Sequence, residues 1–225
     1  LNLTGRKKLN YYPEIYNLIH ELQPECLVAN NHHLPPFKGE DYQIFERDVP
    51  GENNAGHSGQ EISRLPLETC QTINNSWGYS ITDDNYKSTK ELLKLLISTA
   101  GKGANLLLNV GPMPNGKIQP ECTERLNQIG EWLQKYGYTI YNTRVTSPKN
   151  FEWGTITEKG SVYYIHVLDK QMTSLELDMP NIKSAKWINV KGDIQLKKNK
   201  TSGTTTFLLD GELDDVDSII EVTLK

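Results

Sequence analysis

The sequence predicts an α/β part followed by an all-β part, a partial (β/α)8-type barrel and then an antiparallel β-sandwich. In the first part, amphipathic helical segments alternate with short apolar segments of the kind that form parallel strands. After about residue 145 the helical periodicity ends, and short strands follow one another between Gly, Pro, Asn and Asp residues. The 225 residues suffice for two cores, and we expect the domains to be residues 1–144 and 145–225.

The first predicted helix covers residues 13–23. Ile15, Leu18 and Leu22 recur at the spacing of one helix face, and Pro24 ends the pattern. Three strands are expected after it, at residues 26–29, 42–45 and 67–73. The connections around the second strand are long and rich in Pro and Gly, and connections of this length are usually functional.

Local signals place two further helices and one more strand. Ser88 is an N-cap residue with Glu91 three positions later, a capping box that predicts a helix over residues 89–100. The run Asn-Leu-Leu-Leu-Asn-Val-Gly-Pro at 105–112 is typical of a fully buried strand that stops at a turn. A second long helix is predicted over residues 120–136.

The second part contains only strand patterns. Short runs of alternating apolar and polar residues are separated by turn-forming residues, as in an antiparallel sandwich. These predicted strands cover residues 163–168, 174–177, 185–190, 204–209 and 219–224.

The first part has too few strands for a closed barrel. We count about four, whereas a (β/α)8 barrel needs about eight. Half of such a sheet leaves unpaired edges and an exposed inner face. We therefore expect the chain to begin inside a longer protein, and expect either the missing N-terminal half-barrel or a complementary chain as a partner.

Composition excludes several classes of function. The net charge of −4 gives no large cationic field, so nucleic-acid binding is not expected. The apolar runs are only a few residues long, so no segment is expected to span a membrane. Three cysteines without metal-type spacing favour buried thiols over a disulfide framework, and no metal site is expected.

Carboxylates, imidazoles and an aromatic residue are predicted near one mouth of the barrel. These residues are Glu46, Glu68, His32, His33 and Trp77. Paired carboxylates beside an aromatic surface suit glycoside hydrolysis, in which one carboxyl protonates the leaving oxygen and another acts as nucleophile or base.

Each of these residues also has an ordinary structural interpretation. Glu46, and Glu52 in the same loop, could be solvated charges, and Glu68 could hold neighbouring loops through hydrogen bonds. The histidine pair at 32–33 could be a strand-end pair, because no third metal ligand stands at a characteristic spacing. Trp77 could be a core aromatic residue.

A series of ordered motifs resembles the α-L-fucosidases of glycoside hydrolase family 29. The motifs are Leu-Glu-Thr-Cys at 67–70, Asn-Asn-Ser-Trp-Gly-Tyr at 74–79, Tyr-Lys-Ser-Thr at 86–89, Lys-Gly-Ala-Asn-Leu-Leu-Leu-Asn-Val-Gly-Pro at 102–112, Arg-Leu-Asn-Gln-Ile-Gly-Glu-Trp-Leu at 125–133 and Ile-Tyr-Asn-Thr-Arg at 140–144. The segments 26–33 and 41–48 resemble the bacterial branch of the family, which implies a secreted or periplasmic location.

The resemblance implies a barrel followed by a sandwich, and a retaining exo-hydrolase that removes terminal α-L-fucose from glycans without a cofactor. It places the acid/base glutamate at Glu46, with Glu52 as a second candidate because the family varies in this loop. It also places Trp77 in the fucose pocket, and His32 where some members carry an arginine.

The resemblance also implies that one catalytic residue lies outside this chain. The family's aspartate nucleophile stands in a Trp-x-Asp motif before the helix at 13–23, and no such motif precedes that helix here. The first aspartate, Asp41, follows the helix. Two other hypotheses stay open, a non-catalytic carbohydrate-binding or interaction protein and a different glycosidase that shares the barrel.

Overall fold

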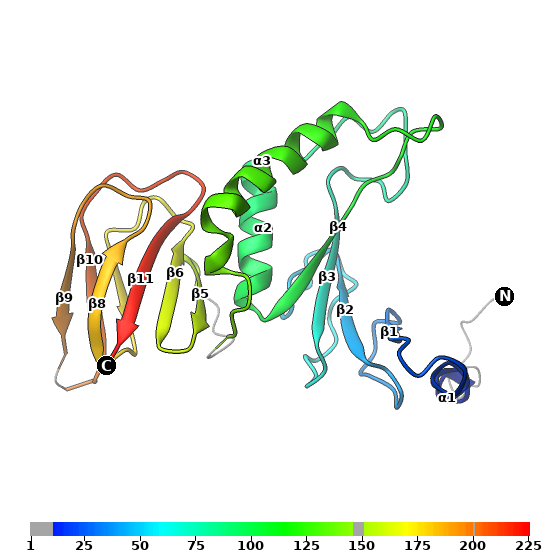
Figure 1. Cartoon of the computed structure of the whole chain (residues 1–225), viewed down its shortest axis with the longest axis horizontal. Coiled ribbons are helices and arrows are strands. Elements are labelled where there is room, and N and C mark those ends of the chain that lie inside the picture. Colours follow the sequence, from blue (N-terminus) through cyan, green and yellow to red (C-terminus); the bar gives the residue numbers. More distant parts are fainter. Residues whose placement is uncertain (1–10, 146–150, 200) are drawn as a thin grey trace. The chain divides into compact units, whose positions relative to one another are not determined.

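The structure is a computed structural model that describes residues 11–145, 151–199 and 201–225 (Figure 1). Its contacts divide the chain into two units. The first unit contains the residues up to Thr72 together with Ala104–Asn109, and the second contains Ile73–Gly103 and Val110–Lys225. The expectation that the chain begins inside a longer protein concerns residues 1–10, which lie outside the described residues. The predicted boundary between residues 144 and 145 lies next to residues 146–150, which are also outside them.

From residue 11 onward, the first unit is one helix and a parallel four-stranded sheet. The elements are α1 (Tyr12–Leu22), β1 (Ala29–Asn30), β2 (Tyr42–Glu46), β3 (Leu67–Thr72) and β4 (Ala104–Asn109), with the strands in the order β1-β2-β3-β4. Glu46 is the register partner of Cys70, and Cys70 is the partner of Leu107, so these three side chains project from one face. Phe45 points to the other face and is fully buried.

Two strand predictions in this unit were wrong in detail. The strand expected at 26–29 is present only as β1, because the Val28 N–H donates to the Asp41 carboxylate at 2.7 Å instead of to a neighbouring strand. The strand expected to be fully buried ends at Asn109, and Leu107 is 46% exposed. Leu107 lies on an edge strand, on a face that the described residues of this unit leave partly open.

The second unit begins with the helices α2 (Thr89–Gly101) and α3 (Pro120–Tyr136), followed by a short 3-10 turn, η2 (Gly137–Thr139). The predicted capping box is confirmed, since the Ser88 hydroxyl accepts from the Glu91 N–H and the Glu91 carboxylate accepts from the Ser88 N–H. At its other end α2 packs directly on the following sheet. A Cβ at Gly101 would lie 1.8 Å from Oγ1 of Thr155, so only glycine allows this approach.

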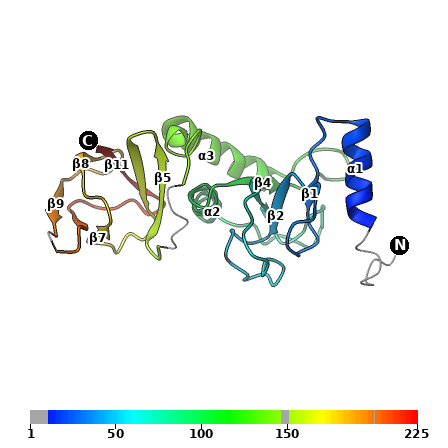
Figure 2. The same ribbon diagram turned by 90° about the horizontal axis from the view of Figure 1, so that it is seen from below.

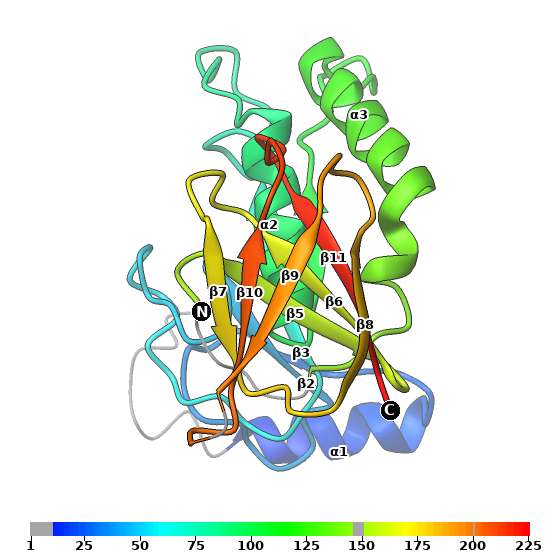
Figure 3. The ribbon, with the colours of Figure 1, turned by 90° about the vertical axis from the view of Figure 1, so that its left-hand side faces the viewer.

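The rest of the second unit is two antiparallel sheets, with no described helix. Their strands are β5 (Gly154–Lys159), β6 (Val162–Val167), β7 (Ser174–Leu177), β8 (Ile182–Trp187), β9 (Ile194–Lys198), β10 (Thr205–Leu209) and β11 (Ser218–Leu224). The sheet β7-β10-β9 faces the sheet β5-β6-β11-β8 across a shared apolar core that includes Ile165, Phe207 and Ile220 (Figure 3). Strands β5 and β9 were not predicted, and β8 begins three residues earlier than expected. Strand β5 carries a single apolar residue, Ile156, and the alternation of β9 is limited to Ile194 and Leu196, so neither segment has a long apolar pattern.

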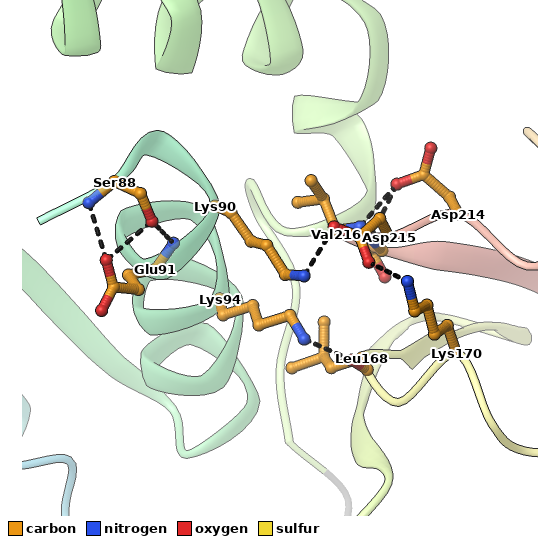
Figure 4. A network of polar contacts seen from close by, with 10 residues as sticks. Ser88, Lys90, Glu91, Lys94, Leu168, Lys170, Asp214, Asp215 and Val216 are labelled. Atoms are coloured by element: carbon orange, nitrogen blue, oxygen red, sulfur yellow. Dashed lines mark hydrogen bonds and ion pairs between the residues drawn. The ribbon is translucent and has the colours of Figure 1, made fainter.

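A polar network connects α2 to the loops of these sheets (Figure 4). The Asp215 carboxylate binds Lys90 of α2 at 2.6 Å and Lys170 at 2.7 Å. Next to it, Lys94 donates to the carbonyl of Leu168. Hydrogen bonds to both lysines lower the pKa of Asp215 to about 2.

The cysteine prediction was correct for pairing and partly wrong for burial. All three cysteines are free thiols; Cys122 is buried, but Cys26 and Cys70 are partly exposed. Cys70 is partly exposed because it lies on the same sheet face as the partly exposed Leu107. Among the described residues, no helix is both long and apolar enough to cross a membrane.

Candidate active site at the end of strand β2

Glu46 is the last residue of β2, and its side chain is 21% exposed. Two residues from the loop after β1 approach its Oε2 atom: Asn31 donates through Nδ2 at 3.4 Å, and His33 Nε2 lies at 3.8 Å. The carboxyl ends of parallel strands meet at the same edge of a sheet, which is why residues 13–15 positions apart in the sequence come together here.

The backbone around this carboxylate takes an unusual conformation. His33 has φ +59° and Arg47, which follows Glu46, has φ +64°. Left-handed conformations in residues other than glycine cost about 1 kcal/mol or more and cluster at functional sites. The Arg47 N–H donates to the Cys70 carbonyl at 2.8 Å, so the strand pairing holds this conformation in place.

The His33 ring carries an unsatisfied nitrogen close to Glu46. Its Nδ1 atom is buried and has no hydrogen-bond partner among the described residues. The ring packs against His57 with 5.4 Å between centroids. Sequence reasoning missed both His57 and Asn31, since His57 lies in a Gly-rich loop whose path no local pattern predicts.

Three more titratable side chains share the sheet face of Glu46. Tyr42 and Glu68 lie nearer the start of their strands, and Cys70 lies opposite Glu46. Burial raises the pKa of Glu68, and burial together with the carboxylates of Glu46 and Glu68 raises the pKa of the Cys70 thiol. This face therefore carries the carboxyl groups of Glu46 and Glu68, and among the described residues no cation pairs with Glu68.

The loop after β2 is ordered around a buried carboxylate. Asp48, which is 3% exposed, accepts from the N–H groups of Asn54 at 2.9 Å and Ala55 at 3.0 Å. The Ser58 hydroxyl donates to the Glu46 carbonyl at 3.1 Å. Glu52 is exposed on this loop and accepts from Asn54 Nδ2 at 3.2 Å, so the structure does not bring it into contact with the Glu46 group.

His32 has surroundings very different from those of its neighbour His33. Its Nε2 atom lies 2.7 Å from the fully buried carboxylate of Glu40, and its ring stacks on Phe37 at 4.2 Å. Glu40 also accepts from the Tyr16 hydroxyl at 3.1 Å. In this structure His32 therefore ties the loop after β1 to helix α1, and a substrate contact for it stays a prediction.

Trp77 belongs to the second unit and lies on a tight loop. The Ser76 N–H donates to Asp83 at 2.8 Å, and a Cβ at Gly111 would lie 2.3 Å from the Gly78 carbonyl carbon. Trp77 is 36% exposed and is therefore not a core aromatic residue. These contacts hold the backbone on both sides of Trp77, so the exposed indole projects from a fixed loop.

The arrangement around Glu46 can hold and transfer a proton. A half-buried carboxyl with an amide and an imidazole beside it has the parts of a general acid/base. Among the residues that the structure describes, no group of His, Cys, Asp and Glu side chains is placed to hold a metal ion.

Comparison with known proteins identifies the family. The family model described as "Alpha-L-fucosidase" matches residues 4–138, well over half of the chain. This chain belongs to the α-L-fucosidase family. It is 34% identical over 153 residues to an α-L-fucosidase of Branchiostoma floridae, a match that covers 67% of this chain and 31% of that protein.

Solved α-L-fucosidases share the fold. α-L-Fucosidase isoenzyme 1 from Paenibacillus thiaminolyticus aligns with 100% of this chain and 56% of its own, at 27% identity and a TM-score of 0.76. The enzyme from Vibrio sp. strain EJY3 aligns with 99% of this chain and 40% of its own, at 24% identity and a TM-score of 0.80. The chain thus spans about a third to half of the length of these α-L-fucosidases.

Proposed function

We propose that this chain is the acid/base-bearing portion of a retaining exo-α-L-fucosidase that acts on terminal α-L-fucose of glycans. The observation that carries the proposal is Glu46, a half-buried carboxyl at a parallel strand end, inside the region that matches the family. Its neighbours Asn31 and His33 come from the loop after the adjacent strand β1, as expected for a site assembled where parallel strands end.

The proposed reaction is a double displacement. Glu46 protonates the departing glycosidic oxygen while an aspartate outside this chain attacks the anomeric carbon of fucose. Glu46 then removes a proton from water, and that water releases fucose with retained configuration. The two carboxyls need to lie about 5–5.5 Å apart, so catalysis requires the polypeptide that brings the aspartate.

Other residues take supporting roles in this proposal. The Asn31 amide donates to the Glu46 carboxyl and orients it, and the His33 imidazole lies beside the same carboxyl oxygen at 3.8 Å. The exposed face of Trp77 is suited to pack on the apolar face of a sugar ring. The parallel sheet contributes half of a (β/α)8 barrel, the two antiparallel sheets form the sandwich, and the remaining strands come from polypeptide outside this chain.

The test is an assay of a chromogenic α-L-fucoside with two proteins. One is the 225-residue chain. The other is the same chain extended by the polypeptide that the upstream coding sequence encodes. We expect turnover only from the longer protein, with α-L-fucose as the first product by NMR. Absence of turnover in the longer protein, or β-L-fucose as the first product, would contradict the proposal.

A further inference from the structure

Three loops at one end of the two antiparallel sheets surround a hollow in the protein surface. The loops are residues 168–173, 188–193 and 210–217, and each carries the chain from one sheet to the other. Figure 2 shows β8 of one sheet next to β9 of the other, the two strands that the second loop joins. The hollow has a volume of about 770 Å³ and is lined by residues of all three loops. We call it the loop-end hollow, and its volume is that of a small-molecule site.

The loop-end hollow is not the open margin of an incomplete sheet. All of its lining residues belong to the second unit, and none comes from the parallel sheet of the first unit. The loops cross between two paired sheets, so the hollow presents no unpaired strand edge for another strand to cover.

The backbone around the hollow is held in place. A Cβ at Gly211 would lie 2.6 Å from the carbonyl oxygen of Lys191, so the second and third loops approach each other as closely as glycine allows. The Asn189 amide joins the same two segments: its Nδ2 donates to the Asp217 carbonyl at 2.7 Å, and its Oδ1 accepts from the Ile219 N–H at 2.9 Å. The shape of the hollow is therefore set before any ligand arrives, which lowers the cost of binding.

Three exposed side chains that line the hollow have unused hydrogen-bonding capacity. The side chains of Gln171, Lys191 and Glu212 form no hydrogen bond or ion pair with any described residue. Beside them, Lys170 is held by Asp215 at 2.7 Å, in the network of Figure 4. An amide, an ammonium group and a carboxylate are therefore available to a single ligand.

The charges around the hollow nearly cancel, which narrows the choice of ligand. Lys170 and Lys191 stand against Glu212, Asp214 and Asp215. Asp215 binds Lys170, and Asp214 accepts backbone N–H groups of its own loop, so two of the carboxylates are already engaged. A polyanion would meet the carboxylates and a polycation would meet the lysines, so a strongly charged polymer fits poorly. A neutral ligand rich in hydroxyl groups can donate to a carboxylate and accept from an amide and an ammonium group.

Two half-buried apolar side chains, Val190 and Leu213, also line the hollow. A sugar combines both chemistries, with hydroxyl groups at the edge of its ring and C–H groups on the faces. We propose that the loop-end hollow binds a neutral oligosaccharide, at a site that shares no residue with the candidate active site at Glu46. This binding does not depend on the function proposed above, because none of the lining residues takes part in fucoside hydrolysis.

A methyl NMR titration of the full 225-residue chain tests the site. The probes are four neutral oligosaccharides that contain no fucose: chitotriose, maltotriose, mannotriose and lacto-N-tetraose. Each is added up to about 10 mM, which fills a site with a millimolar Kd. At least one should shift the methyl signals of Val190 and Leu213 in a saturable way, and leave that of Ile81, which is exposed in the second unit, unchanged. A heparin tetrasaccharide, which is strongly anionic, should bind at least about tenfold more weakly.

Two variants locate the site. The double change Gln171→Ala and Glu212→Ala should weaken sugar binding by about tenfold or more, because each lost hydrogen bond lowers the affinity severalfold. Neither side chain has a described partner, so thermal unfolding should match that of the wild type. Gln195→Ala is the matched control, since Gln195 is an exposed glutamine of β9 outside the hollow, and it should leave the affinity unchanged.

Three outcomes would overturn the proposal. If none of the four neutral probes shifts the signals of Val190 and Leu213, the hollow is not a sugar site. Tighter binding of the heparin tetrasaccharide would make the ligand an anion, and an unchanged affinity in the double variant would place the sugar elsewhere. The same titration on the chain extended by its upstream polypeptide gives a second reading, because probes without fucose are not substrates of a fucosidase.

Discussion

Glu46 at the end of β2 and Cys70 of β3 are register partners, and their side chains project from the same face of the parallel sheet. The pairing has a chemical consequence for both residues. Burial, with help from the Glu46 and Glu68 carboxylates, raises the pKa of the Cys70 thiol, so Cys70 stays protonated at neutral pH and is a poor nucleophile. Glu46 is then the better candidate for proton transfer at this strand end.

Replacing Glu46 by alanine in the full-length protein should remove the general acid/base. We expect turnover of fucosides with poor leaving groups to fall by about 10²–10⁴-fold, because these substrates depend on proton donation. Activated aryl fucosides should lose less in the first step. Added azide should restore their turnover by taking the place of water in the second displacement, and NMR should show α-L-fucosyl azide.

Glu52→Ala is the matched control for this experiment. Glu52 lies in the loop after β2, exposed and bound to Asn54, so its loss should change turnover little. Azide rescue in Glu52→Ala combined with near-normal activity in Glu46→Ala would transfer the acid/base role to Glu52.

Glu68→Gln should stabilise the chain at neutral pH relative to acid pH. Burial raises the pKa of Glu68, so the folded state favours its protonated form. That contribution is fully present below the unfolded pKa and is lost as the pH rises through the folded pKa. The glutamine variant keeps a neutral side chain throughout. In urea denaturation, the free energy of unfolding of the variant should rise relative to that of the wild type between pH 4 and pH 7. A difference between the two free energies that does not change with pH would refute this.

Gly101→Ala should destabilise the contact between α2 and β5. The new Cβ would lie 1.8 Å from Oγ1 of Thr155, an overlap that forces the helix and the strand apart. We expect a loss of about 1–3 kcal/mol in the free energy of unfolding. Gly130→Ala in α3 is the control, since its Cβ would meet no atom within 4 Å, and it should stabilise by about 0.5–1 kcal/mol. Similar effects of the two changes in denaturant titrations would show that the contact is not tight.

Two aspartates close in sequence should differ sharply in their effect on stability. Asp217 binds His166 at 2.8 Å and both side chains are fully buried, so Asp217→Ala should cost on the order of 3 kcal/mol. Asp215 pairs with Lys90 and Lys170 at the surface, so Asp215→Ala should have a much smaller effect that fades with added salt. The stabilising contribution of Asp215 is present above its unfolded pKa and is lost only as the pH falls through about 2. Equal losses in thermal unfolding would contradict this ranking.

Local chemistry explains which elements could be predicted. The capping box of Ser88 and Glu91 uses residues three positions apart, so it marked the start of α2 in the sequence itself. The exposure of Leu107 could not be predicted, because an apolar run looks the same whether its strand lies inside a sheet or at its edge. The loss of most of the strand at 26–29 depended on Asp41, thirteen residues away from Val28.

The sequence alone determined that this protein is an α/β part followed by antiparallel strands, and its ordered motifs determined the family. Periodicity and motif order depend on residues that are close together in the sequence, so both can be recognised without a structure. Only the tertiary structure decided that His33 approaches Glu46 while the adjacent His32 binds Glu40. A left-handed backbone at His33 and a buried carboxylate eight residues beyond His32 send the two rings in different directions, and contacts of that kind depend on the path of the folded chain.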